Sequence, residues 1–333
     1  MGILKVEGTI ALDQFWPTGE SDADTTKIHV NVSGDSFIYA ADGQNFVVTH
    51  VFDGARVVGK SNDLVIENGR ITVRLQGVDA PELHYRAAAL PRTSPATPGQ
   101  RAAFNQANRT SRRQHWAESA TLALKDRLSL VDPQTVPCQV LSFVDHPYEL
   151  VDTYGRVVGN IRIGRQFETD INLWLTEEAW VVPTFYSSMT EDEIEALLEA
   201  MRRGFGKGRV LDAISSDTSA FDDRLVYRRN GPAHPGADAG PVLMPKVFRR
   251  QVAYELQKKT GIVSGTFKAF LSDSPDFCFE LEDFLRSTVH SATPRRLHDF
   301  VTGSRLRVAP HEIVFKEKFS SVVDADGRRL DAF

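Results

Sequence analysis

The sequence predicts an α+β protein in which short strands form a five-stranded barrel with helices packed outside it, followed by a mainly helical C-terminal domain. Three observations lead to this prediction. Apolar and polar residues alternate in several short runs of the first half, which is typical of half-buried strands. Other segments carry apolar residues at helical spacing. Near Asp212 the composition turns polar and rich in Gly, Pro and Asp, which is typical of a linker.

The barrel strands are predicted from alternation and from the turns that end them. Residues 71–76 alternate strictly between apolar and polar side chains, and Gly77 ends the run. Residues 27–40 contain two short strands around a turn. The last two barrel strands are expected at 136–143 and 156–163.

Two insertions are expected between the barrel strands, and helices are expected both between these strands and after them. Residues 41–68 contain two more strand-like runs bounded by Asp-Gly and Asn-Gly turns, which predicts an inserted hairpin. Residues 84–113 are rich in Ala, Pro, Arg, Ser and Thr without clear periodicity, so a long mobile loop is expected there. Helices are expected at 114–130, at 170–180 and after the capping-box pattern that starts at Thr190.

These elements divide the chain into four parts. The barrel and its helices are assigned to residues 27–212, and residues 1–26 are taken as an extension before the barrel. A linker is expected at 213–244. Residues 245–333 are predicted to form an accessory domain of unknown role. Its expected helices are 245–259, 276–288 and 294–301.

Composition limits the class of protein. The chain has 333 residues, 41% hydrophobic and 25% charged, which is typical of a globular protein. No run approaches the roughly 18–20 apolar residues of a membrane span, and the first residues lack the pattern of a signal peptide. A cytoplasmic protein that does not bind a membrane is therefore expected. Cys138 and Cys278 lie far apart in sequence and are expected to be reduced, without a zinc site.

The segment 71–82, ITVRLQGVDAPE, carries the chemistry most clearly. Its strand runs directly into a sharp turn, and Pro81 keeps the residue before it extended. Arg74, Asp79 and Glu82 are thereby held close together on one corner. Two acids beside an arginine suit a metal ion and a phosphate bound together.

This segment resembles the R-L-x-G-x-D-x-P-E signature of the staphylococcal nuclease-like (thermonuclease) family. Three further segments follow the order of the family. Residues 27–39 resemble its first hairpin, with a G-D-[ST] turn at 34–36, and residues 152–161, DTYGRVVGNI, are similar to its D-x-Y-G-R segment. Residues 170–186 resemble the helix and loop after the barrel. The resemblance covers about residues 27–211 and implies an OB-type barrel.

The resemblance also implies one Ca²⁺ ion. Its ligands would be Asp35 from the hairpin turn, Asp79, and the backbone carbonyl of Ala80, all hard oxygen donors. A competing alignment places the metal turn at Asp53-Gly54-Ala55 instead, with alanine where the family has a ligand.

The catalytic roles implied by the resemblance fall on three residues. Arg74 and Arg156 would hold the phosphate through charge-assisted hydrogen bonds. Glu82 would act as general base or orient the attacking water. The expected activity is hydrolysis of DNA or RNA with expulsion of the 5′ oxygen, which leaves a 3′-phosphate. Base stacking by Tyr85, Phe185 or Tyr186 is open, as is a core role for each ring.

Charge leaves other functions open. The net charge of −5 does not favour nucleic-acid binding, although arginines gather at 101–113 and 202–209. One alternative is a non-catalytic module that binds nucleic acid or protein. Another is an assembly protein that contacts a protein partner through its C-terminal domain. If the chain is a nuclease, the segment 84–113 or the C-terminal domain is expected to cover the site, so deletion of 213–333 should raise activity.

Overall fold

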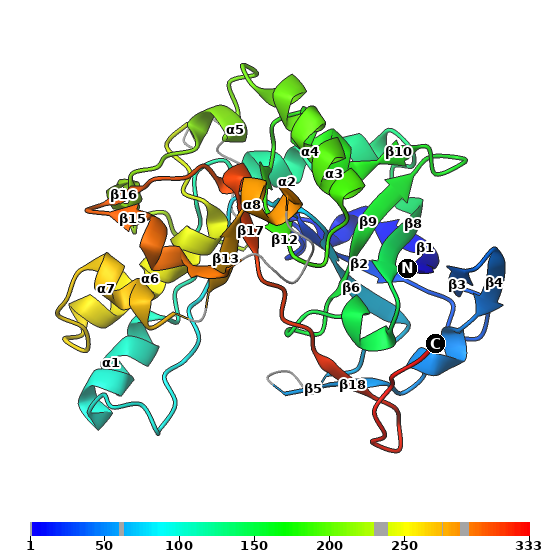
Figure 1. Cartoon of the computed structure of the whole chain (residues 1–333), viewed down its shortest axis with the longest axis horizontal. Helices are drawn as coiled ribbons and strands as arrows, with labels where there is room; N and C mark the ends of the chain where they lie inside the picture. Colours follow the sequence, from blue (N-terminus) through cyan, green and yellow to red (C-terminus); the bar gives the residue numbers. More distant parts are fainter. Residues whose placement is uncertain (1, 60–62, 230–238, 275, 287–292) are drawn as a thin grey trace.

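A computed structural model describes residues 2–59, 63–229, 239–274, 276–286 and 293–333. Five of the described strands form a closed barrel, on the right of Figure 1. The barrel strands are β1 (Gly2–Ala11), β2 (Thr25–His29), β6 (Arg70–Leu75), β8 (Thr135–Val144) and β9 (Val157–Ile163).

The barrel closes through four antiparallel pairs and one parallel pair. Strand β1 pairs with β2 and β8, β2 pairs with β6, and β8 pairs with β9, all antiparallel. The parallel pair β6–β9 completes the circuit. An α+β fold with a five-stranded barrel is thus confirmed, and this arrangement is compatible with an OB-type fold.

The first barrel strand lies in the segment that the sequence placed outside the barrel as an extension. Strand β1 buries its even-numbered residues, among them Leu4, Val6 and Ile10. Gly8 interrupts this alternation, which hides the strand from pattern analysis. A Cβ atom at Gly8 would lie 2.3 Å from the carbonyl oxygen of His29, so the close approach of β2 requires glycine there.

Residues 41–68 do not form one inserted hairpin. Strands β3 (Phe37–Ala41) and β4 (Gln44–Val47) pair with each other, and β3 extends the sheet along β1. Strand β5 (Arg56–Val58) forms a local antiparallel bridge from Arg56 to Leu64 and pairs along its length with β18 (Ser321–Val323), near the end of the chain. The partner of β5 lies more than 260 residues further along the chain, so local alternation could not identify it.

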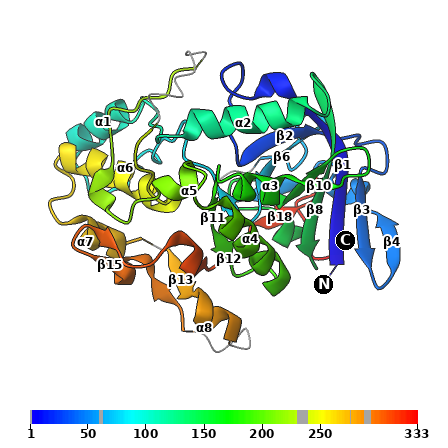
Figure 2. The same ribbon diagram turned by 90° about the horizontal axis from the view of Figure 1, so that it is seen from above.

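Helices cover the barrel, as expected. Helix α2 (Ala117–Ser129) lies across it in Figure 2 and buries the predicted stripe that contains Leu124 and Leu128. The predicted capping box at Thr190 begins α4 (Glu191–Gly204). The other helices of this part are α1 (Pro98–Ala107), α3 (Ile171–Glu177) and α5 (Val210–Ala213). Since α1 lies within 84–113, that segment is not a structureless loop.

The C-terminal part mixes helices and short strands, so a mainly helical domain is not confirmed. Its predicted first helix is present as α6 (Pro245–Lys259), with the expected bounds. The other helices are α7 (Phe267–Ser272) and α8 (Leu281–Arg286). The strands are β13 (Phe277–Glu280), β14 (Arg295–Arg296), β15 (Val301–Thr302), β16 (Arg305–Leu306), β17 (Ile313–Phe315) and β18.

The part of the chain before residue 213 also contains four two-residue strands: β7 (Val78–Asp79), β10 (Thr169–Asp170), β11 (Val182–Pro183) and β12 (Phe185–Tyr186).

The C-terminal part is built into the barrel part. Strand β17 pairs in parallel with β12, and β18 pairs with β5. The ring of Phe333 stacks on Tyr39 with the centroids 4.2 Å apart. Deletion of 213–333 would therefore uncover core partners as well as the site, so point substitutions are the better test of any masking.

Cys138 and Cys278 are both buried and free. Within the described ranges, none of the helices combines the length and the apolar character that crossing a membrane requires.

Candidate active site

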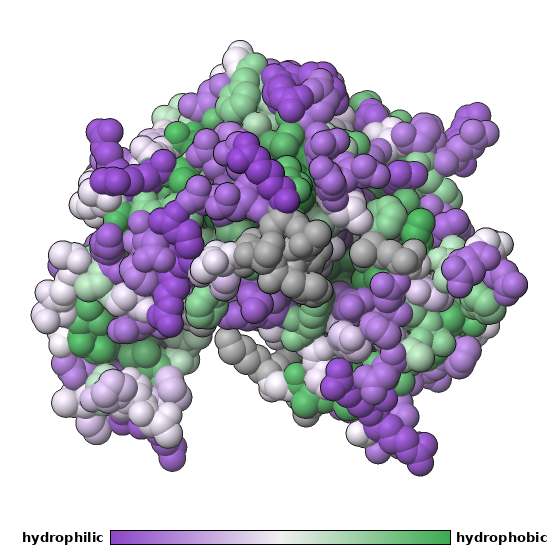
Figure 3. All heavy atoms as spheres, in the orientation of Figure 1, coloured by the Kyte–Doolittle hydropathy of each residue, from purple (hydrophilic) through white to green (hydrophobic). Residues whose placement is uncertain are grey.

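A cleft of about 1580 Å³ lies between the barrel and α6. Residues of β2, β6 and α6 line it, together with 84–91 and 316–321. The molecular surface is notched at the bottom of Figure 3, between the lobe of α1 and α7 and the lobe of β5 and β18. Basic residues outnumber acidic ones in the lining, although the whole chain has a net charge of −5. Local charge therefore favours an anionic ligand in this cleft.

We call the barrel side of the cleft the barrel wall and the helix side the α6 wall. On the barrel wall, Arg74 contacts Asp79. Arg74 lies on β6, and its guanidinium donates a hydrogen bond to Oδ1 of Asp79 on β7. Gly77 turns the chain between them with φ of +73°, a conformation that favours glycine. Burial raises the pKa of Asp79, but the positive charges of Arg74 and Arg249 outweigh burial, so the pKa lies below its usual value. Asp79 is therefore held ionised.

Glu82 meets an arginine from the other wall of the cleft. Arg249 of α6 donates a hydrogen bond from Nη1 to Oε1 of Glu82, and its Nη2 lies 3.8 Å from Oδ2 of Asp79. Burial raises the pKa of Glu82, Arg249 opposes the shift, and Asp24 and Asp79 add to it. The net result is a pKa above the usual value, as suits a proton acceptor in catalysis.

Two aspartates, Asp22 and Asp24, precede β2 and line the same cleft. The backbone N–H of Ala80 donates to Oδ2 of Asp24 at 2.8 Å, which ties the start of β2 to the turn after β6. Burial, and then the charges of Asp24 and Glu82, raise the pKa of Asp22 well above its usual value. Carboxylates crowded in this way attract a cation.

Arg156 reaches the cleft from the segment just before β9. It pairs with Asp152, with Nη2 2.7 Å from Oδ2, and its Nη1 donates to Oγ1 of Thr25 at 3.2 Å. Thr25 is the cross-strand neighbour of Arg74 in the β2–β6 pair. Strand pairing thus places the two predicted phosphate-binding arginines on one side of the cleft.

The structure brings Arg74, Asp79, Ala80, Glu82 and Arg156 together, as the sequence predicted. It does not bring Asp35 to them. Asp35 is exposed in the turn that joins β2 to β3, outside the cleft lining. The β2–β6 register explains this: the start of β2 adjoins Arg74, whereas Asp35 lies beyond the other end of the strand. The alternative, Asp53, is also outside the cleft lining.

Sequence analysis missed the two aspartates that lie at the site. The run Ser-Asp-Ala-Asp-Thr at 21–25 stands directly before an alternating strand, and this was the available signal. The Gly-Asp-Ser turn at 34–36 matched the family turn more literally, and that match decided the assignment. Asp24, whose carboxylate accepts from the backbone of Ala80, therefore lies at this site, whereas Asp35 does not.

Sequence analysis also missed the basic face of α6. Lys246, Arg249 and Arg250 recur at helical spacing and all line the cleft. The spacing alone indicates a charged face, but it cannot say what that face contacts. By contrast, none of the arginines in 101–113 belongs to the described cleft lining. Of the three aromatic candidates, Tyr85 and Tyr186 line the cleft, whereas Phe185 is fully buried in the core.

The oxygen donors at this site suit a hard cation. Oδ2 of Asp79 is buried and has no hydrogen-bond partner among the described residues. Asp24 accepts a hydrogen bond from the backbone N–H of Ala80, the residue after Asp79, and the Ala80 carbonyl would be the third donor. No three described His, Cys, Asp or Glu side chains already form a metal-binding group. This sparse set fits an ion that also keeps water ligands and binds a phosphate oxygen.

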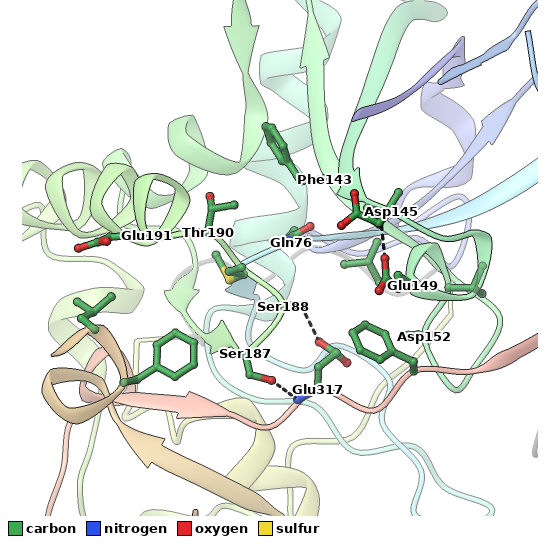
Figure 4. Close-up of a pocket in the computed structure, with 17 residues that line it drawn as sticks. Gln76, Phe143, Asp145, Glu149, Asp152, Ser187, Ser188, Thr190, Glu191 and Glu317 are labelled. Carbon is green, nitrogen blue, oxygen red and sulfur yellow. Dashed lines mark hydrogen bonds between the residues drawn. The ribbon is translucent and has the colours of Figure 1, made fainter. Parts of the chain in front are cut away.

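A second cavity, of about 420 Å³, has the opposite character (Figure 4). Its labelled acids include Asp145, Glu149, Glu191 and Glu317, and none of the described residues that line it is a lysine or an arginine. Oε2 of Glu149 accepts from the backbone of Asp145 at 2.8 Å, and the backbone of Glu317 donates to Ser187 at 2.9 Å. These contacts tie loops together, and the acidic lining would repel phosphate. The cleft beside α6 is therefore the candidate active site.

A comparison with known proteins does not identify a family for this chain. No family model matches the chain, and no curated protein sequence matches it either. The resemblance to the thermonuclease family rests on the motifs and on the residues that they bring to the cleft.

Proposed function

We propose that this chain is a metal-dependent phosphodiesterase that cleaves nucleic acid, on an OB-type barrel like that of the thermonuclease family. One observation carries the proposal: two arginines, a buried aspartate and a glutamate with a raised pKa converge at a cleft whose lining has more basic than acidic residues. The sequence motifs by themselves point to the same residues.

Each residue has a chemical task in this proposal. Arg74 and Arg156 bind the non-bridging oxygens of the scissile phosphate and stabilise its growing negative charge. Glu82 accepts the proton of the attacking water, or orients that water. A Ca²⁺ ion held by Asp24, Asp79 and the Ala80 carbonyl would supply further charge neutralisation. By resemblance, the 5′ oxygen leaves and the product carries a 3′-phosphate.

A second candidate function is a module that binds nucleic acid without cleaving it. The contact between Arg249 and Glu82 favours this alternative, because the proposed base is already neutralised by an arginine. A cleft whose acids are paired internally can bind a phosphate backbone through its remaining lysines and arginines.

The first experiment separates the two functions. Single-stranded DNA, duplex DNA and RNA are incubated with the full chain in Ca²⁺ or in chelator, and products are separated by size. We expect Ca²⁺-dependent cutting that Glu82→Gln reduces by about 10²–10⁴-fold, the usual contribution of a general base. Glu195→Gln, at an exposed position of α4, is the matched control and should cut normally.

The other outcomes have definite meanings. Equal cutting by the Glu82→Gln and wild-type chains would remove Glu82 from the mechanism. Binding of nucleic acid without cutting by either chain would select the binding module.

A further inference from the structure

The basic face of α6 contains one cation that differs from its neighbours. Arg249 is paired with Glu82. Arg250 is paired with Asp276 through two hydrogen bonds, from Nε at 2.6 Å and from Nη2 at 2.8 Å. Lys246 also lines the cleft, one helical turn before Arg250. Both arginines therefore have carboxylate partners, and the environment of Lys246 differs from theirs.

The ammonium of Lys246 lies beside two aromatic rings. Its Nζ lies 3.9 Å from the ring centroid of Phe315 and 5.2 Å from that of Tyr186. Within the described part of the chain it has no ion pair. Burial, together with the charges of Arg249 and Arg74, lowers its pKa to about 8, although Asp276 and Asp79 oppose the shift. A half-buried ammonium in a cleft, with hydrogen-bond donors still available, is suited to bind an anion.

Lys246 is adjacent to the proposed catalytic arginine. The guanidinium carbon of Arg74 lies 6.0 Å from the centroid of Tyr186, the same ring that Lys246 contacts. Strand pairing fixes this arrangement, because Tyr186 on β12 is the register partner of Phe315 on β17. Two cations on one rigid aromatic ring can hold two neighbouring phosphates of a single strand.

We infer that Lys246 is a second phosphate subsite, which binds the phosphate next to the scissile one, so that the preferred ligand is a polynucleotide strand. This inference rests on the proposed function, since it assigns the scissile phosphate to Arg74 and Arg156. It assigns a binding role to a part of the chain that lies outside the family resemblance. Longer strands should consequently bind more tightly than a ligand with a single phosphodiester.

The test measures binding without cleavage. Fluorescence anisotropy in chelator compares a labelled dinucleotide, which has one phosphodiester, with a labelled single-stranded oligonucleotide, over a range of salt concentrations. Each phosphate contact on a single strand contributes about 0.7 to the slope of log K against log salt. We expect Lys246→Met to lose about that much slope for the oligonucleotide and nothing for the dinucleotide.

Two variants serve as controls. Lys246→Arg retains the charge and should keep the slope of the wild-type chain. Lys258→Met lies on the same helix, beside the ring of Tyr254 at 5.3 Å, but outside the cleft lining, and should also keep it. Inorganic phosphate is added as a competitor to distinguish a strand from the free anion.

Each result decides the matter. An unchanged slope in Lys246→Met, with normal strand binding by the wild-type chain, would overturn the subsite and leave the proposed nuclease intact. Wild-type chain that binds neither ligand would overturn both. Complete competition by dilute inorganic phosphate would show that the site takes the free anion, which would also overturn the inference.

Discussion

The two walls of the cleft differ in composition and in how they are encoded. The barrel wall carries acids and arginines together, and Arg74, Asp79 and Glu82 come from a single stretch of nine residues. The α6 wall presents a basic face, whose Arg249 meets Glu82 across 167 positions of sequence. In the proposed function the barrel wall thus supplies the reacting groups, and the α6 wall supplies the charges that neutralise acids and attract phosphate. A motif can therefore be recognised in a short stretch of sequence, whereas the charges that surround it in the folded protein come from distant segments and cannot.

The largest effect is expected from the buried pair of the barrel wall. Arg74→Met would leave the carboxylate of Asp79, which has no exposed surface, without its main partner. Breaking a buried ion pair in this way costs about 3–5 kcal/mol of unfolding free energy. Urea denaturation of the variant measures this cost.

The matched control is an exposed pair. Arg202→Met removes a side chain that is 64% exposed and is paired with Glu199, which is 52% exposed. Exposed pairs contribute about 0–1 kcal/mol, so this variant should unfold nearly as the wild-type chain does. Equal costs for the two variants would mean that Arg249 already compensates Asp79 fully.

The next effect separates the two aspartates proposed for the metal. Asp24→Asn removes a charged ligand and should raise the Ca²⁺ concentration for half-maximal cutting by about tenfold or more, because affinity follows the ligand charge. Asp35→Asn should leave it unchanged, because Asp35 lies outside the cleft. Calorimetry of Ca²⁺ binding provides a readout independent of activity. The reverse pattern would restore Asp35 as the ligand.

The smallest effect concerns the contact between the walls. Arg249 lowers the pKa of Glu82, against the raising effects of burial and of Asp24 and Asp79. Without Arg249 the pKa of Glu82 rises further, so Glu82 stays protonated up to a higher pH. The ionised form that accepts a proton is then absent over a wider range of acidic pH. Arg249→Met should therefore move the acidic limb of the kcat/KM profile to higher pH.

Arg249→Lys preserves the positive charge and should move this limb less than Arg249→Met does. A limb that stays in place in Arg249→Met, or moves to lower pH, would show that Arg249 does not control the ionisation of Glu82. Increased cutting at every pH, without any displacement of the limb, would instead identify the contact as a mask over the base.

Part of the fold was predictable because local rules govern it. Alternation identified β6, β8 and β9, and helical spacing identified α6 with its observed bounds. Strand β1 was missed because Gly8 breaks the alternation for a reason that lies in another strand, the carbonyl of His29. Strand β5 was expected as a strand, but its pairing with β18 could not be foreseen, because β18 is distant in sequence.

The sequence by itself determined the chemistry of the barrel wall. Spacing within a strand and its turn fixes which side chains share a corner, so Arg74, Asp79 and Glu82 could be selected without a structure. Only the tertiary structure decided which aspartate joins them, and that α6 closes the cleft with Lys246 and Arg249. The physical reason is that register and helix packing depend on contacts between segments far apart in the chain, which no local pattern contains.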